Sequence, residues 1–359
     1  MPRFEGRLNA NEIFASIFNM IISQEVFADN IKKTSNRLVN KAKTDGTLFG
    51  DQKLYYATDV LSSRDWLNDA EAQNLLAVNR PKDPEVQSIE INVARQIDLT
   101  LDNYLSKRAW GDENSFSQFT SVSRQWIYET KKIYDITTYN AFFGTNETNI
   151  GGQQRTINLS AVESDTSLNT EEKARLKAQK IGEHIANLEV DMTDVSRDFN
   201  DYGFMRSYDD EDIQIVWNSK FANAITHIDL PTIFHKDGIV KGLDNVLPSK
   251  YFGKVITEDG TVPADKIIRA LKEKKYGSKD YFAGEQLPTG TSYKAGEVYE
   301  ETDDIICKVI TKLPPYMSGF EVGTSFFNAR SLTENQYLTW LHNTLEHLKN
   351  YPFITIRKN

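Results

Sequence analysis

The sequence predicts a mixed α+β fold that projects an extended ribbon from its body. Three features indicate it: an unusually long strand at Gln87–Asn103, a long amphipathic helix directly after it, and short apolar runs separated by turn signals over residues 238–320. No internal repeat, low-complexity segment or clear linker divides the chain. We therefore expect lobes of one interlocked unit.

The long strand shows side-chain alternation with a period of two. Its odd-numbered positions are mostly apolar, whereas Ala94 is the only apolar residue at an even-numbered position. Such alternation is typical of a strand with one buried face. At about 3.3 Å per residue the strand would reach about 55 Å, beyond an ordinary compact domain. We expect its apolar face to lie largely against the long helix of a neighbouring subunit, through Ile89, Ile91, Val93, Ile97, Leu99 and Leu101.

Composition and charge exclude several classes of protein. The chain has 359 residues, of which 39% are hydrophobic and 26% charged, as in an ordinary folded protein. No apolar run approaches the ~20 residues that span a bilayer, and the first residues are unlike a signal peptide. The single cysteine, Cys307, excludes an internal disulfide framework and suits a reducing compartment. A net charge of −9 argues against general affinity for nucleic acid.

Residues 1–45 have the character of an N-terminal arm. Asn9 or Asn11 can cap a helix whose apolar face runs from Ile13 to Ile21. A basic segment without acidic residues follows. Two interpretations stay open for it: a solvated helix face, or contact with an anionic partner such as DNA or a scaffolding protein. The second interpretation involves Lys32, Lys33, Arg37, Lys41 and Lys43.

The ribbon is predicted over residues 46–111. Lys53–Leu61 is a candidate strand, and Asp65–Val78 is a candidate short helix. Residues 79–85 are expected to form a turn, because two prolines there block regular structure before the long strand begins. A two-stranded ribbon is marginally stable in water, so we expect another surface to hold it in place. Trp66 in the helical insertion is a candidate anchor at such an inter-subunit contact.

A long helix is predicted over Asp112–Phe143. Asp112 is a suitable N-cap, and Gly144 stands where helices often end. The apolar side chains fall on one face, with Trp126 among them, and we expect Trp126 to contact a neighbouring subunit. At 1.5 Å per residue the helix is about 45 Å long, comparable with the strand before it.

The rest of the chain predicts further helices and strands around a sheet. Apolar residues spaced three and four apart indicate the helices, and short apolar runs indicate the strands. The closing strand is expected to pair with a segment far back in the chain. In chain order we expect a helix at Thr170–Val195, a strand at Ile213–Trp217, helices at Ser219–Thr226, Pro263–Lys275 and Thr333–Leu348, and a closing strand at Tyr351–Arg357.

No pattern in the sequence carries a recognisable catalytic, cofactor or metal site. The histidines lack zinc-type spacing, and neither a nucleophile elbow nor a phosphate loop is present. Asp198–Asp209 fits a calcium loop incompletely, and an ordinary turn is the expected structure. The acidic clusters Asp209–Asp212 and Glu300–Asp304 are expected to be solvated turns, although a hydrolase also uses paired carboxylates.

The order of parts resembles the major capsid proteins of tailed bacteriophages, which have the Hong Kong ninety-seven type fold. In that family too, an arm is followed by an extended loop, a long helix and a mixed domain, and the chain finally returns with a helix and a strand. Two stretches, Ile215–Gly238 and Thr324–Ile354, also resemble the major head proteins of small short-tailed phages of Gram-positive hosts.

The resemblance implies a structural protein without enzymatic activity, cofactor or membrane contact. Copies would form the pentamers and hexamers of an icosahedral head that encloses double-stranded DNA, with a scaffolding protein and a portal as partners. Assembly would take place in the cytoplasm of the bacterial host, and the protein would reside in the virion. The implied parts are an N-arm (1–45), an E-loop (46–111), a spine helix with P-domain (112–195), an A-domain (196–320) and a C-terminal return to the P-domain (321–359).

Two other hypotheses stay open at this point. One is a different phage structural component, such as a portal or a tail ring, which a ring without shells would indicate. The other is a carboxylate-dependent hydrolase that uses Asp209–Asp212, Asp303 or Asp304.

Overall fold

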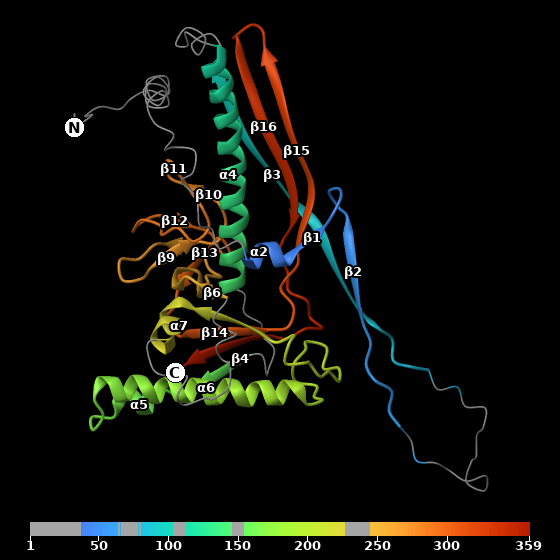
Figure 1. The fold of residues 1–359 in the computed structure, drawn as a ribbon, viewed down its shortest axis with the longest axis vertical. Coiled ribbons are helices and arrows are strands. Elements are labelled where there is room, and N and C mark those ends of the chain that lie inside the picture. The colour runs from blue at the N-terminus through green and yellow to red at the C-terminus, as the bar shows by residue number, and fades with distance from the viewer. Residues whose placement is uncertain are drawn as a thin grey trace.

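The computed structural model describes residues 37–63, 65, 78, 80–102, 113–145, 154–226 and 245–359. Within these ranges the chain builds two five-stranded sheets and three smaller sheets, which confirms the mixed α+β class. Two long helices accompany the larger sheets, α4 (Glu113–Thr145) and α6 (Thr170–Thr193). Figure 1 shows α4 standing along the first sheet and α6 lying across the base of the molecule beside the second.

The first sheet has the strand order β1-β15-β16-β3-β2. β1 runs parallel to β15, and the other neighbouring strands are antiparallel. The long central pair is β16 against β3, from Thr333 opposite Asp102 to Asn343 opposite Ile91. Its strands are β1 (Lys43–Asp45), β2 (Gln52–Ala57), β3 (Glu85–Asp102), β15 (Tyr316–Asn328) and β16 (Thr333–Asn343).

The predicted long strand is confirmed as β3, and its two partners explain its length. Residues 91–102 pair with β16 inside the body of the protein. Residues 85–90 pair with β2, which is the predicted ribbon strand in a shorter form than Lys53–Leu61. β3 therefore belongs to the sheet at one end and to the projecting ribbon at the other (Figure 1). The helix expected at Asp65–Val78 and the helix of the arm lie outside the described residues.

Half of the apolar face of β3 is buried within its own chain, and the other half is only partly covered. Ile89 and Ile91 are 2% and 0% exposed, because they pack against Met317, Leu341 and Leu348 of the same chain. The remaining members of the predicted face are buried or partly buried within the chain as well, namely Val93, Ile97, Leu99 and Leu101.

The predicted long helix is confirmed as α4, and it covers the first sheet itself. Ile127 and Tyr134 of α4 form a buried cluster with Leu338 and Trp340 of β16, and Ile97 and Leu99 of β3 pack against this cluster. The long helix that β3 was expected to meet is thus the helix of its own chain. The proposed N-cap Asp112 lies outside the described residues.

The C-terminal half of α4 holds a second buried cluster. Short helix α2 (Arg37–Ala42) packs there through Leu38, Val39 and Ala42. The buried Lys308 side chain donates a hydrogen bond from Nζ to the Phe143 carbonyl oxygen at 2.9 Å, at the end of the helix where carbonyls lack helical partners. Gly144 is needed there for space, because a Cβ on it would lie 2.1 Å from the Tyr251 carbonyl oxygen.

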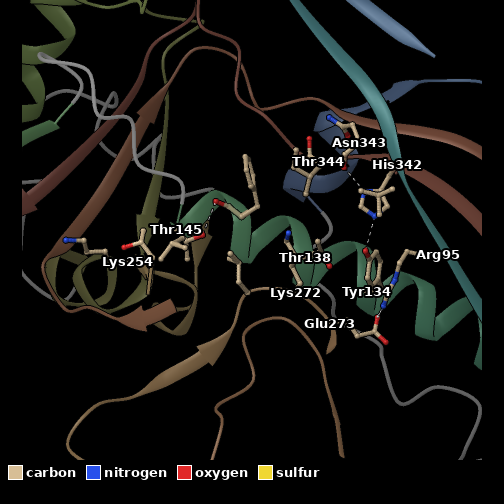
Figure 2. A pocket seen from close by; sticks show the side chains of 16 residues that line it. Arg95, Tyr134, Thr138, Thr145, Lys254, Lys272, Glu273, His342, Asn343 and Thr344 are labelled. Carbon is tan, nitrogen blue, oxygen red and sulfur yellow. Dashed lines mark hydrogen bonds and ion pairs between the residues drawn. The ribbon is translucent and has the colours of Figure 1, made fainter. Parts of the chain in front are cut away.

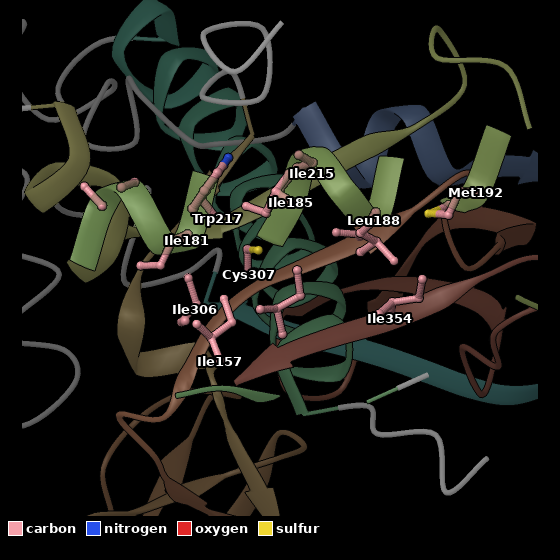
Figure 3. Packing of buried hydrophobic residues seen from close by; sticks show 14 of the residues in the cluster. Ile157, Ile181, Ile185, Leu188, Met192, Ile215, Trp217, Ile306, Cys307 and Ile354 are labelled. Atoms are coloured by element: carbon pink, nitrogen blue, oxygen red, sulfur yellow. The ribbon is translucent and has the colours of Figure 1, made fainter. Parts of the chain in front are cut away.

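The second sheet has the order β4-β17-β14-β5-β6 and carries α6 on one face. Figure 3 shows Ile181, Ile185 and Leu188 of α6 lying over side chains of the central strands. A capping box of Asn169 and Glu172 begins α6, which confirms the predicted helix. The strands are β4 (Gln154–Ile157), β5 (Gln214–Asn218), β6 (Val246–Leu247), β14 (Ile305–Ile310) and β17 (Phe353–Lys358).

Three further predictions near the second sheet are confirmed. β5 matches the predicted buried strand, and α7 (Ser219–Thr226) matches the helix predicted after it. β17 is the predicted closing strand, and it pairs with β14 and with the distant β4. A short helix, α5 (Ser160–Ser164), precedes α6.

The helix predicted at Pro263–Lys275 was wrong. This segment contains strand β9, with Ile268 and Ala270 buried at alternate positions, and then enters hairpin β10–β11, whose turn uses Gly277 at φ 64°. The surrounding elements are η4 (Ser249–Tyr251), β7 (Gly253–Val255), β8 (Gly260–Thr261), β9 (Ile268–Ala270), β10 (Lys274–Tyr276), β11 (Lys279–Tyr281), β12 (Ser292–Tyr293) and β13 (Val298–Glu301).

The helix predicted at Thr333–Leu348 was also wrong, because this segment forms β16. Gln336, Leu338 and Trp340 are buried at every second position, which is the period of a strand. β16 hydrogen-bonds to β15 on one side and to β3 on the other, and this pairing decides its conformation. Among the described residues no helix is both long enough and apolar enough to cross a membrane.

Candidate assembly surfaces

The ribbon is anchored to the first sheet by a tight turn at residues 47–51. Thr47 donates from its backbone nitrogen and its hydroxyl to the Asp51 carboxylate, at 3.1 and 2.8 Å, and these hydrogen bonds lower the pKa of Asp51. Ile91 donates from its backbone nitrogen to the Asp51 carbonyl oxygen at 3.0 Å. Gly50 adopts φ 85°, which disfavours other residues. The turn fixes the direction in which β2 leaves the body.

A second anchor holds the ribbon beyond β2. Arg197 donates from Nη1 to Asp59 Oδ2 at 2.8 Å, and the Met205 backbone nitrogen donates to Asp59 Oδ1 at 3.1 Å. These donors lower the pKa of Asp59 to about 2, with the Arg197 hydrogen bond as the largest cause. Arg206 donates from Nη2 to the Thr58 carbonyl oxygen at 2.7 Å. The ribbon is therefore held by hydrogen bonds to the loop between α6 and β5.

The described part of the ribbon exposes apolar side chains to solvent. Leu54 and Tyr56 of β2 are 51% and 65% exposed, and Tyr56 stands opposite the half-exposed Val86 of β3. Contiguous exposed apolar surface of this kind marks interaction sites. We call the following set the exposed ribbon residues: Leu48, Phe49, Leu54, Tyr56, Val60, Leu61 and Val86.

The opposite edge of the first sheet offers a second exposed surface. β1 pairs only with residues 316–318 of β15, and Phe320 donates its backbone N–H to the Thr47 carbonyl oxygen. From Glu321 to Asn328 the outer edge of β15 has no strand partner in the described ranges. Phe326 and Phe327 are exposed along it. Unpaired edges of this length readily accept another strand or chain.

The inter-subunit residues named from sequence therefore divide into groups. The β3 face is largely internal, Trp126 is partly buried on α4, and Trp66 lies outside the described residues. Sequence reasoning missed the exposed ribbon residues as a contact surface. The signal was present in the alternating Leu54, Tyr56 and Val60. A two-stranded ribbon has no core of its own to bury such side chains, so they are available to contact another surface.

Part of the basic segment can be placed. Lys32 and Lys33 lie outside the described residues, and Arg37 begins α2 without a described side chain. Lys41 and Lys43 are exposed. Because α2 turns Leu38, Val39 and Ala42 toward α4, Lys41 lies on the opposite, solvent side.

A buried network of charges joins α4 to β15. Lys131 contacts Asp135 at 2.9 Å and Glu321 at 3.2 Å, and Tyr316 donates its hydroxyl hydrogen to Asp135. Burial alone lowers the pKa of Lys131, but the two carboxylates outweigh it and the pKa is raised. The network is satisfied by its own members, so it serves packing rather than chemistry.

Two carboxylates of the acidic cluster Glu300–Asp304 are held in ion pairs. Asp303 pairs with Lys220 at 2.6 Å, and Asp304 pairs with Arg357 at 2.6 Å. Asn200, in the incomplete calcium loop, uses both amide atoms on the Phe204 backbone. Over the described ranges no cluster of metal-ligating side chains occurs. Cys307 is buried, and burial raises the pKa of its thiol.

Comparisons with known proteins identify the family and the fold. The profile of the family described as Phi29-like phage major capsid protein matches residues 5–339. A chain in the "Capsid structure of Staphylococcus phage Andhra" has a TM-score of 0.57 at 12% identity, covering 89% of this chain and 84% of that one. A chain in the "Structure of head fiber and inner core protein gp22 of native bacteriophage P68" has a TM-score of 0.55 at 11% identity, covering 88% and 83%. No curated protein sequence matches the chain.

The fold is that of the Hong Kong ninety-seven type phage capsid proteins. The chain belongs to the Phi29-like phage major capsid protein family. It is a structural component of an icosahedral phage capsid, it self-assembles into that shell, and it resides in the virion.

Proposed function

We propose that copies of this chain form the pentamers and hexamers of a phage head and that each ribbon lies across a neighbouring copy. The exposed ribbon residues carry this proposal. They sit on a two-stranded element that is marginally stable alone, and aromatic and aliphatic side chains of this kind form the centre of protein interfaces. A neighbouring copy would bury them and complete the ribbon.

The exposed ribbon residues therefore replace the apolar face of β3 as the main proposed inter-subunit contact. Val93, Ile97 and Leu99 are only partly buried and remain candidates at its margin, with Trp126 and Trp66. Ile89 and Ile91 are buried within the chain at the ribbon end of β3, and Leu101 is buried at the other end of the strand.

The division into named parts is also a proposal. We assign residues 1–45 to an N-arm, 46–111 to the E-loop, and α4 with β15 and β16 of the first sheet to a P-domain. The second sheet with α6 forms the core of an A-domain. Its strand order supports assigning Phe353–Lys358 and Thr170–Thr193 to that A-domain, in place of the boundaries 112–195, 196–320 and 321–359.

We further propose that the head encloses double-stranded DNA and is built with a scaffolding protein and a portal in the cytoplasm of the bacterial host. The net charge of −9 supports a shell that does not hold DNA tightly. The exposed Lys41 and Lys43, with Lys32, Lys33 and Arg37, are the proposed contacts to DNA or scaffold. We propose no enzymatic activity, because Asp303 and Asp304 are engaged in ion pairs.

Electron microscopy of purified protein tests the proposed contact. A variant carrying Leu54→Asp and Tyr56→Asp places charge on the exposed ribbon residues. Since both side chains are exposed, the free energy of unfolding should change by less than about 0.5 kcal/mol, while shells and capsomers are lost.

The matched control carries Val190→Asp and Val195→Asp, two exposed apolar residues at the end of α6. This variant should assemble like the wild type. Normal shells from the ribbon variant would contradict the contact, and rings of six or twelve copies without shells would instead indicate a portal or tail component.

A further inference from the structure

We propose that a cavity between α4, the first sheet and the small strands binds an amphipathic anion, with an apolar body and one acidic group. The cavity has a volume of about 560 Å³ and is open on one side. Figure 2 shows its lining side chains arriving from helix α4, from the middle of β3, from the end of β16, and from the β7 and β9–β10 region. This inference is independent of the contacts made during shell assembly.

The interior of the cavity is apolar. Its apolar lining comes from Val93, Tyr134, Phe142, Val255, Leu271 and Leu345. Phe142 and Leu271 are only partly buried, so apolar surface is left open to whatever enters. Cavities of about 300–1,000 Å³ with such a lining are the usual size for small organic ligands.

The rim of the cavity carries an excess of positive charge. Lys254 and Lys272 are exposed at its mouth, and Arg95 reaches it from β3. Glu273 is the one carboxylate in the lining, and it is engaged by Arg95 at 3.0 Å. Three cations against one carboxylate favour an anionic ligand group.

Several polar groups of the lining are already hydrogen-bonded within the protein, whereas the buried Thr138 hydroxyl has no hydrogen-bond partner among the described residues. His342 Nδ1 lies 2.6 Å from the Asn343 carbonyl oxygen, which can only accept, so Nδ1 carries the hydrogen. In the neutral ring Nε2 then accepts from the Tyr134 hydroxyl at 2.9 Å. Thr145 donates to the Ala141 carbonyl oxygen. The apolar end of a ligand therefore meets no unsatisfied charge in the interior.

A ligand in this cavity would contact three parts of the chain at once. Arg95 lies on the first sheet, Phe142 on α4 and Leu271 beside β9, so an occupant would add contacts between elements that already meet through buried clusters and through the Arg95–Glu273 ion pair. Binding to the folded state alone stabilises it, and the stabilisation grows with ligand concentration.

Dodecanoate, kept below the concentration at which it forms micelles, is the probe. Titration of the purified chain by calorimetry should show saturable binding of one dodecanoate per chain and a rise in thermal midpoint. Dodecan-1-ol, which has the same apolar body without charge, should bind more weakly. Lys254→Glu with Lys272→Glu should weaken dodecanoate binding about tenfold and bring it close to the alcohol.

Filling the cavity provides the decisive variant. Leu271→Trp should abolish dodecanoate binding, whereas Ile267→Trp, at an exposed position of the same subdomain, should bind like the wild type. Lys279→Glu is the matched charge control away from the cavity. Unchanged binding in Leu271→Trp, or equal binding of acid and alcohol, would overturn the proposal. If another copy or another segment of the chain fills the cavity, the wild type will show no saturable binding, which overturns it too.

Discussion

Ile91 shows how one side chain separates folding from assembly. It is fully buried, and a Cβ added at Gly46 or Gly319 would lie 2.5 or 3.2 Å from its Cδ1. Only glycine leaves room for Ile91 at these two positions. Ile91→Asp would place an unpaired charge in this space and should lower the free energy of unfolding by at least about 3 kcal/mol.

Urea denaturation of the Ile91→Asp monomer measures this effect. Loss of shells in this variant would follow from loss of the fold, whereas the ribbon variant loses shells without it. A stable Ile91→Asp monomer that fails only in assembly would return Ile91 to the inter-subunit surface.

Gly144 gives a second prediction at the scale of one residue. Replacing glycine by alanine inside a helix usually raises stability by about 1 kcal/mol. Here the new Cβ would lie 2.1 Å from the Tyr251 carbonyl oxygen and 2.7 Å from its carbon, so Gly144→Ala should lower the free energy of unfolding by about 1–3 kcal/mol. Thermal or chemical unfolding checks the sign. Gly323→Ala is the control without a clash, because its new Cβ would lie 3.7 Å from the nearest atom, the Tyr128 hydroxyl oxygen.

At the scale of elements, the anchor at Asp59 controls how freely the ribbon moves. Its low pKa means that the ion pair with Arg197 persists above about pH 3.8 and is lost as the pH falls toward 2. Asp59→Asn removes the charge at neutral pH. We expect faster tryptic cleavage after the exposed Lys82, with little change in thermal midpoint. Asp98→Asn, on the exposed face of β3, should leave cleavage unchanged, and equal rates in both variants would contradict the anchor.

The elements also show what sequence reasoning can reach. β3, α4, α6 and α7 were predictable because their apolar periods are long or clearly bounded. β16 was not, because its spacing through Leu338, Leu341 and Leu345 also fits a helix and only pairing with β15 and β3 decides it. Lys272–Lys275 has strong helix propensity but lies where hairpin β10–β11 begins.

The candidate surfaces were less predictable than the elements. Periodicity identifies an apolar face, but it does not say whether that face meets its own chain or another. For β3 it depends on the tertiary positions of α4 and β15, which cover this face in the folded chain. In β2 the same kind of alternation places Leu54 and Tyr56 in solvent.

At the scale of the whole molecule, His342 links acidity to the junction of α4 and the first sheet. Burial lowers its pKa, and Tyr134, Tyr316, Arg95, Lys131 and Asp135 surround it. A histidine kept neutral in the fold binds a proton more readily when unfolded. Stability is therefore full above about pH 6.5 and falls as the pH drops below it.

The pH dependence is measured as the change in thermal midpoint between pH 7.5 and pH 5. His342→Gln keeps a neutral donor and acceptor at this position, so its midpoint should fall less than that of the wild type. His184 also has a lowered pKa from burial, and His184→Gln separates its share. The same pH slope in wild type and His342→Gln would exclude His342 as a source.

The position of β17 in the second sheet has a consequence for timing. β17 is flanked by β4, from near residue 155, and by β14, from near residue 308. β14 already pairs with β5 on its other side, but β4 joins the sheet only through β17. The sheet therefore stays incomplete until residues 353–358 have been synthesised. The first sheet and ribbon can form before that moment, but a copy without β17 lacks the rigid base from which the ribbon is held. Synthesis order would thus delay entry of unfinished copies into a growing shell.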